Sequence, residues 1–327
     1  PTALRVACLL SAPALLASLK VLQKALERKS VEFNAVIKSG RTHLQDAVPV
    51  RLGSEFGSYA SSIKNSIARI TAALDGLKHI GLGGTAAGTG INTHPAYRKT
   101  VLRALSKVSG IKSLKPAPDN FEALNGMGDF TAFSVTLKNT ALELIRIAND
   151  LRLLSSGPHT GLSEITLPAV QPGSSIMPGK VNPVIAEMLD MVGFQVVGFD
   201  LTVALAAQAG QLELNVMLPV INYNILQSVE ILTTSVGIFA GRCVSGIKAD
   251  RKRCREYFEG SVGLATALNR FIGYEKAAAV AKEAASTGKT VKELVIEKGL
   301  FTEKEWRAVA DASTGPADLK KIKKMRR

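Results

Sequence analysis

The stretch QPGSSIMPGKVNPV, residues 171–184, concentrates side chains that could hold a small dicarboxylate. Lys180 would supply an ammonium charge and Asn182 an amide donor, and backbone amides near a helix start also favour anions. Ser174 and Ser175 add two hydroxyls between a glycine and a proline. The same residues also fit a mobile loop before a capped helix, so this stretch alone leaves both interpretations open.

A serine in this setting could act as a base only with help, because an ordinary hydroxyl is far too weak to remove a proton from carbon. Loop amides and a nearby cation such as Lys180 would have to stabilise its alkoxide. A helix is expected to follow directly, since Asn182 can cap free backbone amides and Pro183 fits the first helical turn.

A second polar cluster occupies SGRTHLQDAVP, residues 39–49. Its polar side chains include Arg41, Thr42, His43, Gln45 and Asp46. Only one of the four histidines, His43, lies in such a dense polar group. It could shuttle a proton near neutral pH if a carboxylate oriented its other ring nitrogen. Because a lone histidine is more often structural, this interpretation depends on the two clusters acting together.

The glycine-rich stretch GLGGTAAGTG, residues 81–90, lacks the features of a known nucleotide-binding motif. A dinucleotide fingerprint needs a preceding strand, and a P-loop needs a lysine after the glycines. Here a helix is expected before the glycines and no lysine follows them. A close-packed structural turn is the favoured interpretation, and a contribution to some other site is the alternative.

The elements that must position these residues are mainly long helices. Apolar residues recur at helical spacing between Ala3 and about Ser39, for example Leu15, Leu19 and Leu22. Further long helices are expected at about 53–80, 131–156, 182–208 and 213–241, with shorter ones at 96–109 and 120–133. Almost no alternating strand pattern is present. The pattern predicts an all-α fold built on a central bundle of long helices.

The helical pattern changes near residue 246, where shorter helices separated by glycines begin. We therefore predict a bundle domain over 1–245, which carries the loop 171–184, and a small helical carboxyl-terminal domain with a basic tail over 246–327. The long helices are apolar on more than one face, and burying those faces is easiest against another copy of the chain. Homo-oligomerisation is therefore expected on physical grounds.

Charge and composition limit the partners only weakly. The 41 lysines and arginines exceed the 27 acidic residues and give a net charge of +14, which suits nucleic acid, an anionic membrane or a small anionic substrate. The basic stretches at 248–256 and 320–327 contain few aromatics, so we interpret them as solvated surface and do not expect nucleic-acid binding. The run 188–210 is long enough to span a membrane, but Asp190 and Asp200 interrupt it, so we interpret it as a buried helix of a soluble bundle.

The three cysteines are far apart in the sequence, without the short paired spacings of zinc sites. We therefore expect a reducing compartment, no metal site and no cofactor. No secretory signal is visible in the chain, which begins at Pro1, and a cytoplasmic location is predicted.

The two polar clusters resemble motifs of the fumarase/aspartase superfamily of lyases. GSSIMPGKVNP is similar to the superfamily signature over eleven residues without a gap, and that signature is highly specific. SGRTHLQDAVP, GGTAAGTGINTHP, IANDLRLLSSGP and LNRFIGYEKAA resemble further family stretches in the same order. The resemblance extends from Pro1 to about Leu300.

This resemblance implies a homotetramer whose active sites are each built from three subunits, and anti-elimination from a four-carbon dicarboxylate to give fumarate. It implies that Ser174 is the general base that removes the proton from carbon 3. Ser175, Lys180 and Asn182 would hold the substrate carboxylate. Thr42 would bind substrate and His43 would bind substrate or the reacting water, and Glu187 would be the acidic partner of that histidine.

The leaving group differs between branches of the family. GGTAAGTGINTHP, DNFEAL and LNRFIGYEKAA look more like fumarases, which hydrate fumarate to malate in the tricarboxylic acid cycle. GQLELNVM looks more like aspartases, although Leu218 stands where they typically carry an acid. We favour fumarate hydratase, with aspartate ammonia-lyase as the alternative. The branches that act on argininosuccinate or adenylosuccinate fit less well.

Two further expectations bear on activity. The resemblance implies an amino-terminal domain that ends in a substrate-binding Ser-Ser-Asn type motif, and PTALRVA at the start of this chain looks like the residues just after it. A chain without that domain would lack part of the carboxylate site. The non-enzyme alternative is a basic helical binding or scaffold protein, supported mainly by the net charge.

Overall fold

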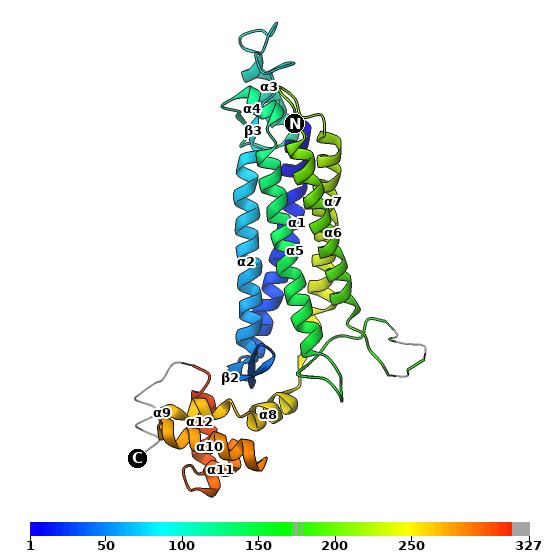
Figure 1. Cartoon of the computed structure of the whole chain (residues 1–327). Coiled ribbons are helices and arrows are strands. Elements are labelled where there is room, and N and C mark those ends of the chain that lie inside the picture. The colour runs from blue at the N-terminus through cyan, green and yellow to red at the C-terminus, as the bar shows by residue number, and fades with distance from the viewer. Residues whose placement is uncertain (172, 174–175, 178, 316–327) are drawn as a thin grey trace. The chain divides into compact units, whose positions relative to one another are not determined.

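The computed structural model describes residues 1–171, 173, 176–177 and 179–315. Within them the fold is mainly helical, with three two-stranded sheets of short strands, which confirms the all-α prediction. Five long helices run side by side as a bundle (Figure 1). They are α1 (Thr2–Glu32), α2 (Leu52–Leu77), α5 (Gly128–Leu154), α6 (Val184–Gln208) and α7 (Leu218–Arg242).

The chain divides into two compact units, each built from separated segments. Unit 1 contains residues 1–25, 59–153 and 168–246, and unit 2 contains residues 26–58, 154–167 and the chain from Ile247 onward. The division between these units passes through α1 and α2. The division of the chain into two consecutive domains at residue 246 stays a prediction.

The bundle core of unit 1 follows the spacing read from the sequence. Along α1, Cys8, Ala12, Leu15, Leu19 and Leu22 are fully buried. Their steps of four, three, four and three residues form a stripe of the kind that packs long helices at small crossing angles. This arrangement confirms the helical interpretation of the chain as far as Glu32.

The connection after α1 differs from the prediction of a helix reaching Ser39. The helix ends at Glu32, and β1 (Ile37–Thr42) pairs antiparallel with β2 (Gln45–Arg51). Only two residues, His43 and Leu44, connect these strands. Both have positive φ, 54° and 60°, as a type I′ hairpin turn requires. The absence of Asn-Gly at the turn hid this hairpin from sequence analysis.

Two smaller boundaries also differ from expectation. The helix expected over 120–133 ends early, since α4 (Asn120–Asn125) stops before α5 begins. The helix expected from Glu213 begins only at Leu218, because Asn215 is fully buried and occupies the connection. Its side-chain amide donates to the carbonyl of Ala206 at 3.1 Å, and its oxygen accepts from the backbone of Met217 at 2.8 Å.

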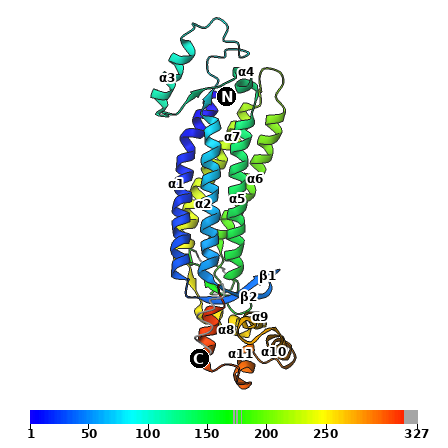
Figure 2. The same ribbon diagram turned by 90° about the vertical axis from the view of Figure 1, so that its left-hand side faces the viewer.

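One end of unit 1 carries the glycine-rich stretch and two short helices, α3 (Tyr97–Ser109) and α4 (Figure 2). A Cβ atom added to Gly81, Gly84 or Gly88 would press against Ala123, Asn120 or Phe121 of α4, respectively. Gly88 also has a φ of +104°. The glycines therefore permit close packing on α4, which confirms the interpretation of this stretch as a structural turn.

The interior of the bundle holds two acidic side chains of α6, both paired. Asp200 accepts from the Ser134 hydroxyl at 2.7 Å and forms an ion pair with Lys138 at 2.5 Å. Asp190 forms an ion pair with Arg152 at 2.7 Å. Buried carboxylates are tolerated when they are paired in this way. These two pairings fix which face of α6 points into the bundle, although the helix is apolar in composition.

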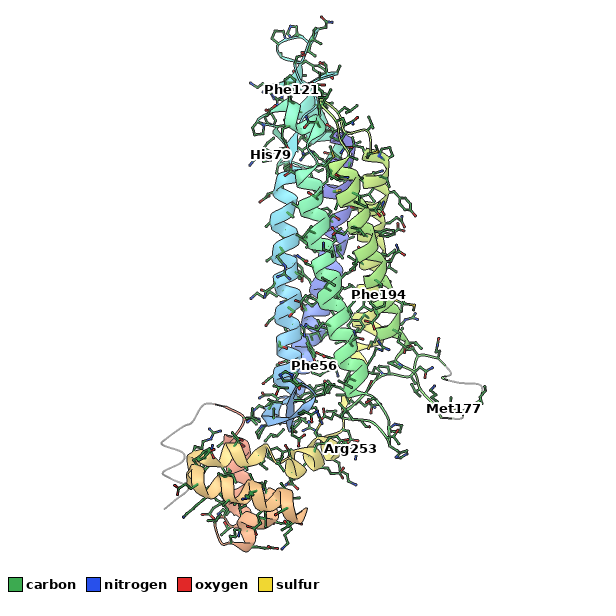
Figure 3. The ribbon with its side chains drawn as sticks, viewed as in Figure 1. Phe56, His79, Phe121, Met177, Phe194 and Arg253 are labelled. Carbon is green, nitrogen blue, oxygen red and sulfur yellow. The ribbon has the colours of Figure 1, made fainter. Side chains whose placement is uncertain are left out.

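Two helices, α1 and α6, are long and apolar enough to cross a membrane by length and composition alone. The prediction that α6 is a buried helix is only half correct, because its opposite face is exposed within one chain. Phe194 lies on that helix, as labelled in Figure 3, and its side chain is 61% exposed.

Unit 2 has its own core, in which the short helices after residue 250 pack around buried Phe271, Val295 and Trp306. These helices are α8 (Arg251–Gly260), α9 (Leu264–Ile272), α10 (Tyr274–Thr287), α11 (Val291–Glu297) and α12 (Glu303–Ala312). Thr290 and Glu293 form a capping box at the start of α11. A short strand pair, β5 (Ile165–Thr166) with β6 (Lys248–Ala249), completes this unit.

Candidate active site

The loop 171–184 is described at its base, where its two ends meet. The side-chain amide of Asn182 donates to the carbonyl oxygen of Gly173 at 3.0 Å. The predicted cap is therefore wrong: α6 begins at Val184 with Pro183 at its N-cap and without a side-chain cap. Asn182 closes the loop instead. Ser174 and Ser175 lie outside the described residues, so their proposed roles stay predictions.

Gly173 contributes to the same closure through its lack of a side chain. A Cβ atom built on it would overlap the carbonyl oxygen of Lys180 and crowd the Cα atom of Val181. Lys180 itself is exposed, and its backbone amide donates to the carbonyl of Met177 at 3.3 Å. The base of the loop therefore holds Lys180 and Asn182, the two residues that the family resemblance implies would hold the substrate carboxylate.

We expect Gly173→Ala to open the base of this loop, because neither backbone can yield without losing the bond from Asn182. The elimination activity that the family resemblance implies should fall by at least about tenfold, a change of about 1.4 kcal/mol in the barrier, while the circular dichroism spectrum stays unchanged. Gly241→Ala is the matched control, since a Cβ atom there meets nothing within 4 Å. Equal activity in both variants would contradict this role for Gly173.

Glu187 lies in the first turn of α6 and faces an arginine of the same unit. Its carboxylate is 3.8 Å from the guanidinium of Arg152, which also pairs with Asp190 at 2.7 Å. Burial raises the pKa of Asp190 above its ordinary value, and the bond from Arg152 opposes that shift. The arginine therefore holds both acids of this helix face in place.

Sequence analysis missed Arg152 as a member of this cluster. It lies in IANDLRLLSSGP, a stretch that resembles a family motif but to which no role was given from the sequence. The available signal was the spacing of Glu187 and Asp190, three residues apart and thus on one face of a helix. Two acids on one mostly apolar helix need a cation opposite them, and Arg152 fills that need.

Thr42 and His43 lie in unit 2, at the tip of the hairpin formed by β1 and β2. Both are exposed, and His43 occupies the first turn position. The strand that leads to them is anchored by ion pairs. Arg41 contacts the Glu164 carboxylate at 2.8 Å, and the Lys38 ammonium contacts the other oxygen of Glu164 at 2.7 Å.

The ion pairs that Glu164 forms with Lys38 and Arg41 are largely buried. The Glu164 side chain is 0% exposed, Lys38 is 2% exposed and Arg41 is 15% exposed. Lys38 also contacts Glu55 at 2.9 Å, and the Arg41 guanidinium lies 5.2 Å from the centre of the Tyr257 ring. The hairpin tip thus projects from a fixed base, while its own side chains stay accessible.

The division of predicted residues between units follows from these positions. Lys180, Asn182 and Glu187 belong to unit 1, and Thr42 and His43 belong to unit 2. Within the described ranges, no group of three or more His, Cys, Asp or Glu side chains could hold a metal ion. Burial raises the pKa of the free thiols of Cys8, Cys243 and Cys254 to about 12, so they stay protonated at neutral pH.

Comparison with protein families gives two matches. A family described as "Lyase" matches residues 1–198, and one described as "Fumarase C C-terminus" matches residues 264–314.

Among individual relatives, an aspartate ammonia-lyase of Pseudomonas canavaninivorans is 51% identical over 302 residues, which is 92% of this chain and 64% of that protein. A class II fumarate hydratase of Corynebacterium glutamicum is 48% identical over 286 residues, 88% of this chain and 60% of that protein. The chain therefore spans less than two thirds of the length of these relatives.

Solved structures agree with these relatives. The cobalt-bound crystal structure of a fumarate lyase:delta crystallin from Brucella melitensis has a TM-score of 0.92 and 48% identity, and covers 97% of this chain and 69% of that one. A class II fumarase from Schistosoma mansoni has a TM-score of 0.89 at 38% identity, and covers 97% of this chain and 70% of that one. The long-helix bundle therefore occurs in known structures of similar sequence.

Proposed function

Because this chain belongs to the fumarase/aspartase superfamily of lyases, we propose that it catalyses anti-elimination from a four-carbon dicarboxylate, with fumarate as the unsaturated product. The observation that carries this proposal is the superfamily loop signature placed directly before α6, with its base closed by Gly173 and Asn182. Such a loop brings a cation and an amide donor to one place without burying either permanently.

In this mechanism Ser174 removes the proton from carbon 3. The electrons left on that carbon delocalise into the adjacent carboxylate, which gains a second negative charge as an aci-carboxylate. Lys180 and Asn182 stabilise that charge, and Ser175 donates to the same group. Stabilisation of charge that appears only in the transition state raises the turnover rate more than it raises substrate affinity.

The opposite side of the site handles the leaving group. His43 binds the substrate or the reacting water, with Thr42 beside it, and Glu187 is the acid that orients the imidazole. Glu187 is partly exposed and its carboxylate lies 3.8 Å from the Arg152 guanidinium, so it stays accessible to an imidazole, which supports this role. The described positions of Thr42 and His43 support it as well, since both are exposed at the hairpin tip.

The identity of the leaving group, water or ammonia, is the second part of this proposal. The fumarase-like stretches favour water, which would make the reaction the hydration of fumarate to malate. The relatives named aspartate ammonia-lyase reach 51% identity, slightly above the 48% of the fumarate hydratase. Together with GQLELNVM they favour ammonia, so we place deamination of aspartate first and fumarate hydration second.

The distinguishing experiment follows the ultraviolet absorbance of fumarate in parallel reactions with malate and with aspartate. Product from aspartate alone would support the ammonia-lyase, and product from malate alone would support the hydratase. No product from either, by a chain with intact helical content, would contradict the elimination proposal. It would favour the scaffold alternative, for which salt-sensitive binding to nucleic acid is the expected result.

We also propose that the chain assembles as a homotetramer with shared active sites. The exposed face of α6 carries Met191, Phe194, Leu201 and Leu205, whose side chains are 57–62% exposed within one chain. Their spacing of three, seven and four residues fits one helix face. From residue 191 to residue 208 this face carries no charge, whereas a solvated helix face is normally polar.

A second copy of the chain is a better occupant of this face than a lipid bilayer. The inward face of the same helix carries Asp190 and Asp200, each paired with a cation of the bundle. A helix that spans a membrane as an isolated segment would carry both carboxylates into hydrocarbon, at high cost. The cytoplasmic location and a role in the tricarboxylic acid cycle stay predictions.

We expect Leu201→Glu to break this assembly, because one carboxylate per chain would be buried without a partner at the interface. Sedimentation velocity should show smaller species for the variant than for the unmodified chain. Ala72→Glu, which adds the same charge at an exposed position on α2, should leave the assembly intact. An unchanged oligomeric state in Leu201→Glu would show that this face is not the interface.

A further inference from the structure

One segment of unit 1 contains cations without any acidic residue. Between Asp75 and Asp119 the chain carries seven lysines and arginines and neither aspartate nor glutamate. Five of these cations, Arg98, Lys99, Arg103, Lys107 and Lys112, line a single cleft. None of the roles proposed above for the elimination reaction uses this segment.

The cleft is formed between α3 and the chain that returns beneath it. At one end the hydroxyl of Ser106 donates to the carbonyl of Ile111 at 2.7 Å. At the other end the Arg98 guanidinium donates to the carbonyl of Ala117. The returning chain is fixed in turn, because the amide of Lys115 donates to the carbonyl of Lys78 at 2.9 Å. The two walls are therefore tied at both ends, with a cavity of about 920 Å³ between them.

This space is present because α3 does not pack into a core. None of its residues is buried, and Figure 2 shows the helix standing apart from the long helices of the bundle. The cavity is lined in part by Pro95, Leu102, Leu114 and Pro116. Its volume lies within the range of about 300–1,000 Å³ that is usual for small-molecule sites.

The cations are arranged in a row and lack acidic partners. Lys99, Arg103 and Lys107 are spaced four residues apart, so they follow one helix face at intervals of about 6 Å. None of the five cations has a carboxylate within ion-pair distance in the described part of the chain. The Nε atom of Arg98 is also buried without a hydrogen-bond partner there. A buried donor of this kind calls for an acceptor from water or from a ligand.

We propose that this cleft binds a small, multiply charged anion that carries a planar aromatic ring, which is the chemistry of a nucleoside triphosphate. The row of cations would bind successive phosphates, and the prolines and leucines would contact the ring. This mode needs no P-loop, so it is compatible with the exclusion of the glycine-rich stretch as a nucleotide motif. Within unit 1, α3 and the start of α6 lie toward opposite ends of the bundle (Figure 1).

The test is isothermal titration calorimetry of the whole chain with ATP, tripolyphosphate and adenosine as separate probes. We expect ATP to bind more tightly than tripolyphosphate and adenosine to show no measurable binding. Arg103→Gln with Lys107→Gln should weaken ATP binding by at least about tenfold, since two charges are removed from the row. Lys276→Gln with Lys282→Gln removes two exposed charges from α10 and should leave the affinity unchanged.

Three outcomes would overturn the proposal. Equal ATP affinity in the cleft variant and in the unmodified chain would show that the phosphates bind elsewhere. Equal affinity for tripolyphosphate and ATP would show that the apolar lining contacts no ring. Tighter binding of a short single-stranded oligonucleotide than of ATP at the same phosphate concentration would identify the partner as a nucleic acid, a different class.

Discussion

Replacing Ser174 by alanine is expected to lower turnover by about 10²–10⁴-fold, the contribution typical of a positioned general base. The substitution removes one hydroxyl outside the five long helices, so the bundle should fold as before. Turnover is measured as fumarate formation from whichever substrate proves active, and folding by the circular dichroism spectrum. The loss should appear in kcat, because the missing step is proton removal and the carboxylate contacts remain.

Two further variants separate a base from a merely structural serine. Ser174→Cys should recover part of the lost rate, because a thiol ionises more readily than a hydroxyl. A structural serine would gain nothing from that exchange. Ser54→Ala removes a hydroxyl from an exposed position on α2 and should leave kcat unchanged. A rate close to normal in Ser174→Ala would remove the base assignment.

The sequence was a good guide to the fold wherever one face of a helix repeats over many turns. The stripe that includes Leu15, Leu19 and Leu22 predicted α1, because burial of a repeating face overrides local irregularities. The hairpin was missed for the opposite reason. The two turn residues, His43 and Leu44, have backbone dihedral angles in the left-handed region, which glycine or asparagine normally occupies. Short strands that end in such a turn carry little periodic signal.

The sequence identified several residues of the candidate site, but it did not predict which of them contact each other. Lys180 and Asn182 were identified from the loop, but Asn182 was expected to cap a helix and instead binds Gly173. Arg152 and Glu164 were missed because each matters through a partner far away in the sequence. Pairings of this kind depend on the tertiary fold, and no local spacing reveals them.

Glu164 is the carboxylate whose loss should cost the most stability. It is fully buried between Lys38 and Arg41, so Glu164→Ala would leave two cations without their shared partner. Removing one member of a buried ion pair typically costs about 3–5 kcal/mol. We expect a loss of this size in the free energy of unfolding, measured by urea denaturation. Glu275→Ala, which removes an exposed carboxylate from α10 of the same unit, should cost less than about 1 kcal/mol.

The size of this loss depends on the cations that remain, and that dependence can be measured. Adding Lys38→Met to Glu164→Ala should recover part of the stability, because an apolar side chain no longer needs a buried anion. Simple additivity of the two changes would contradict the ion-pair explanation. The same carboxylate also anchors Arg41, which directly precedes Thr42 and His43 on β1. Glu164→Gln, assayed well below its melting temperature, should therefore lower the proposed elimination activity through the hairpin tip, even though its own side chain lies at the buried base of that hairpin.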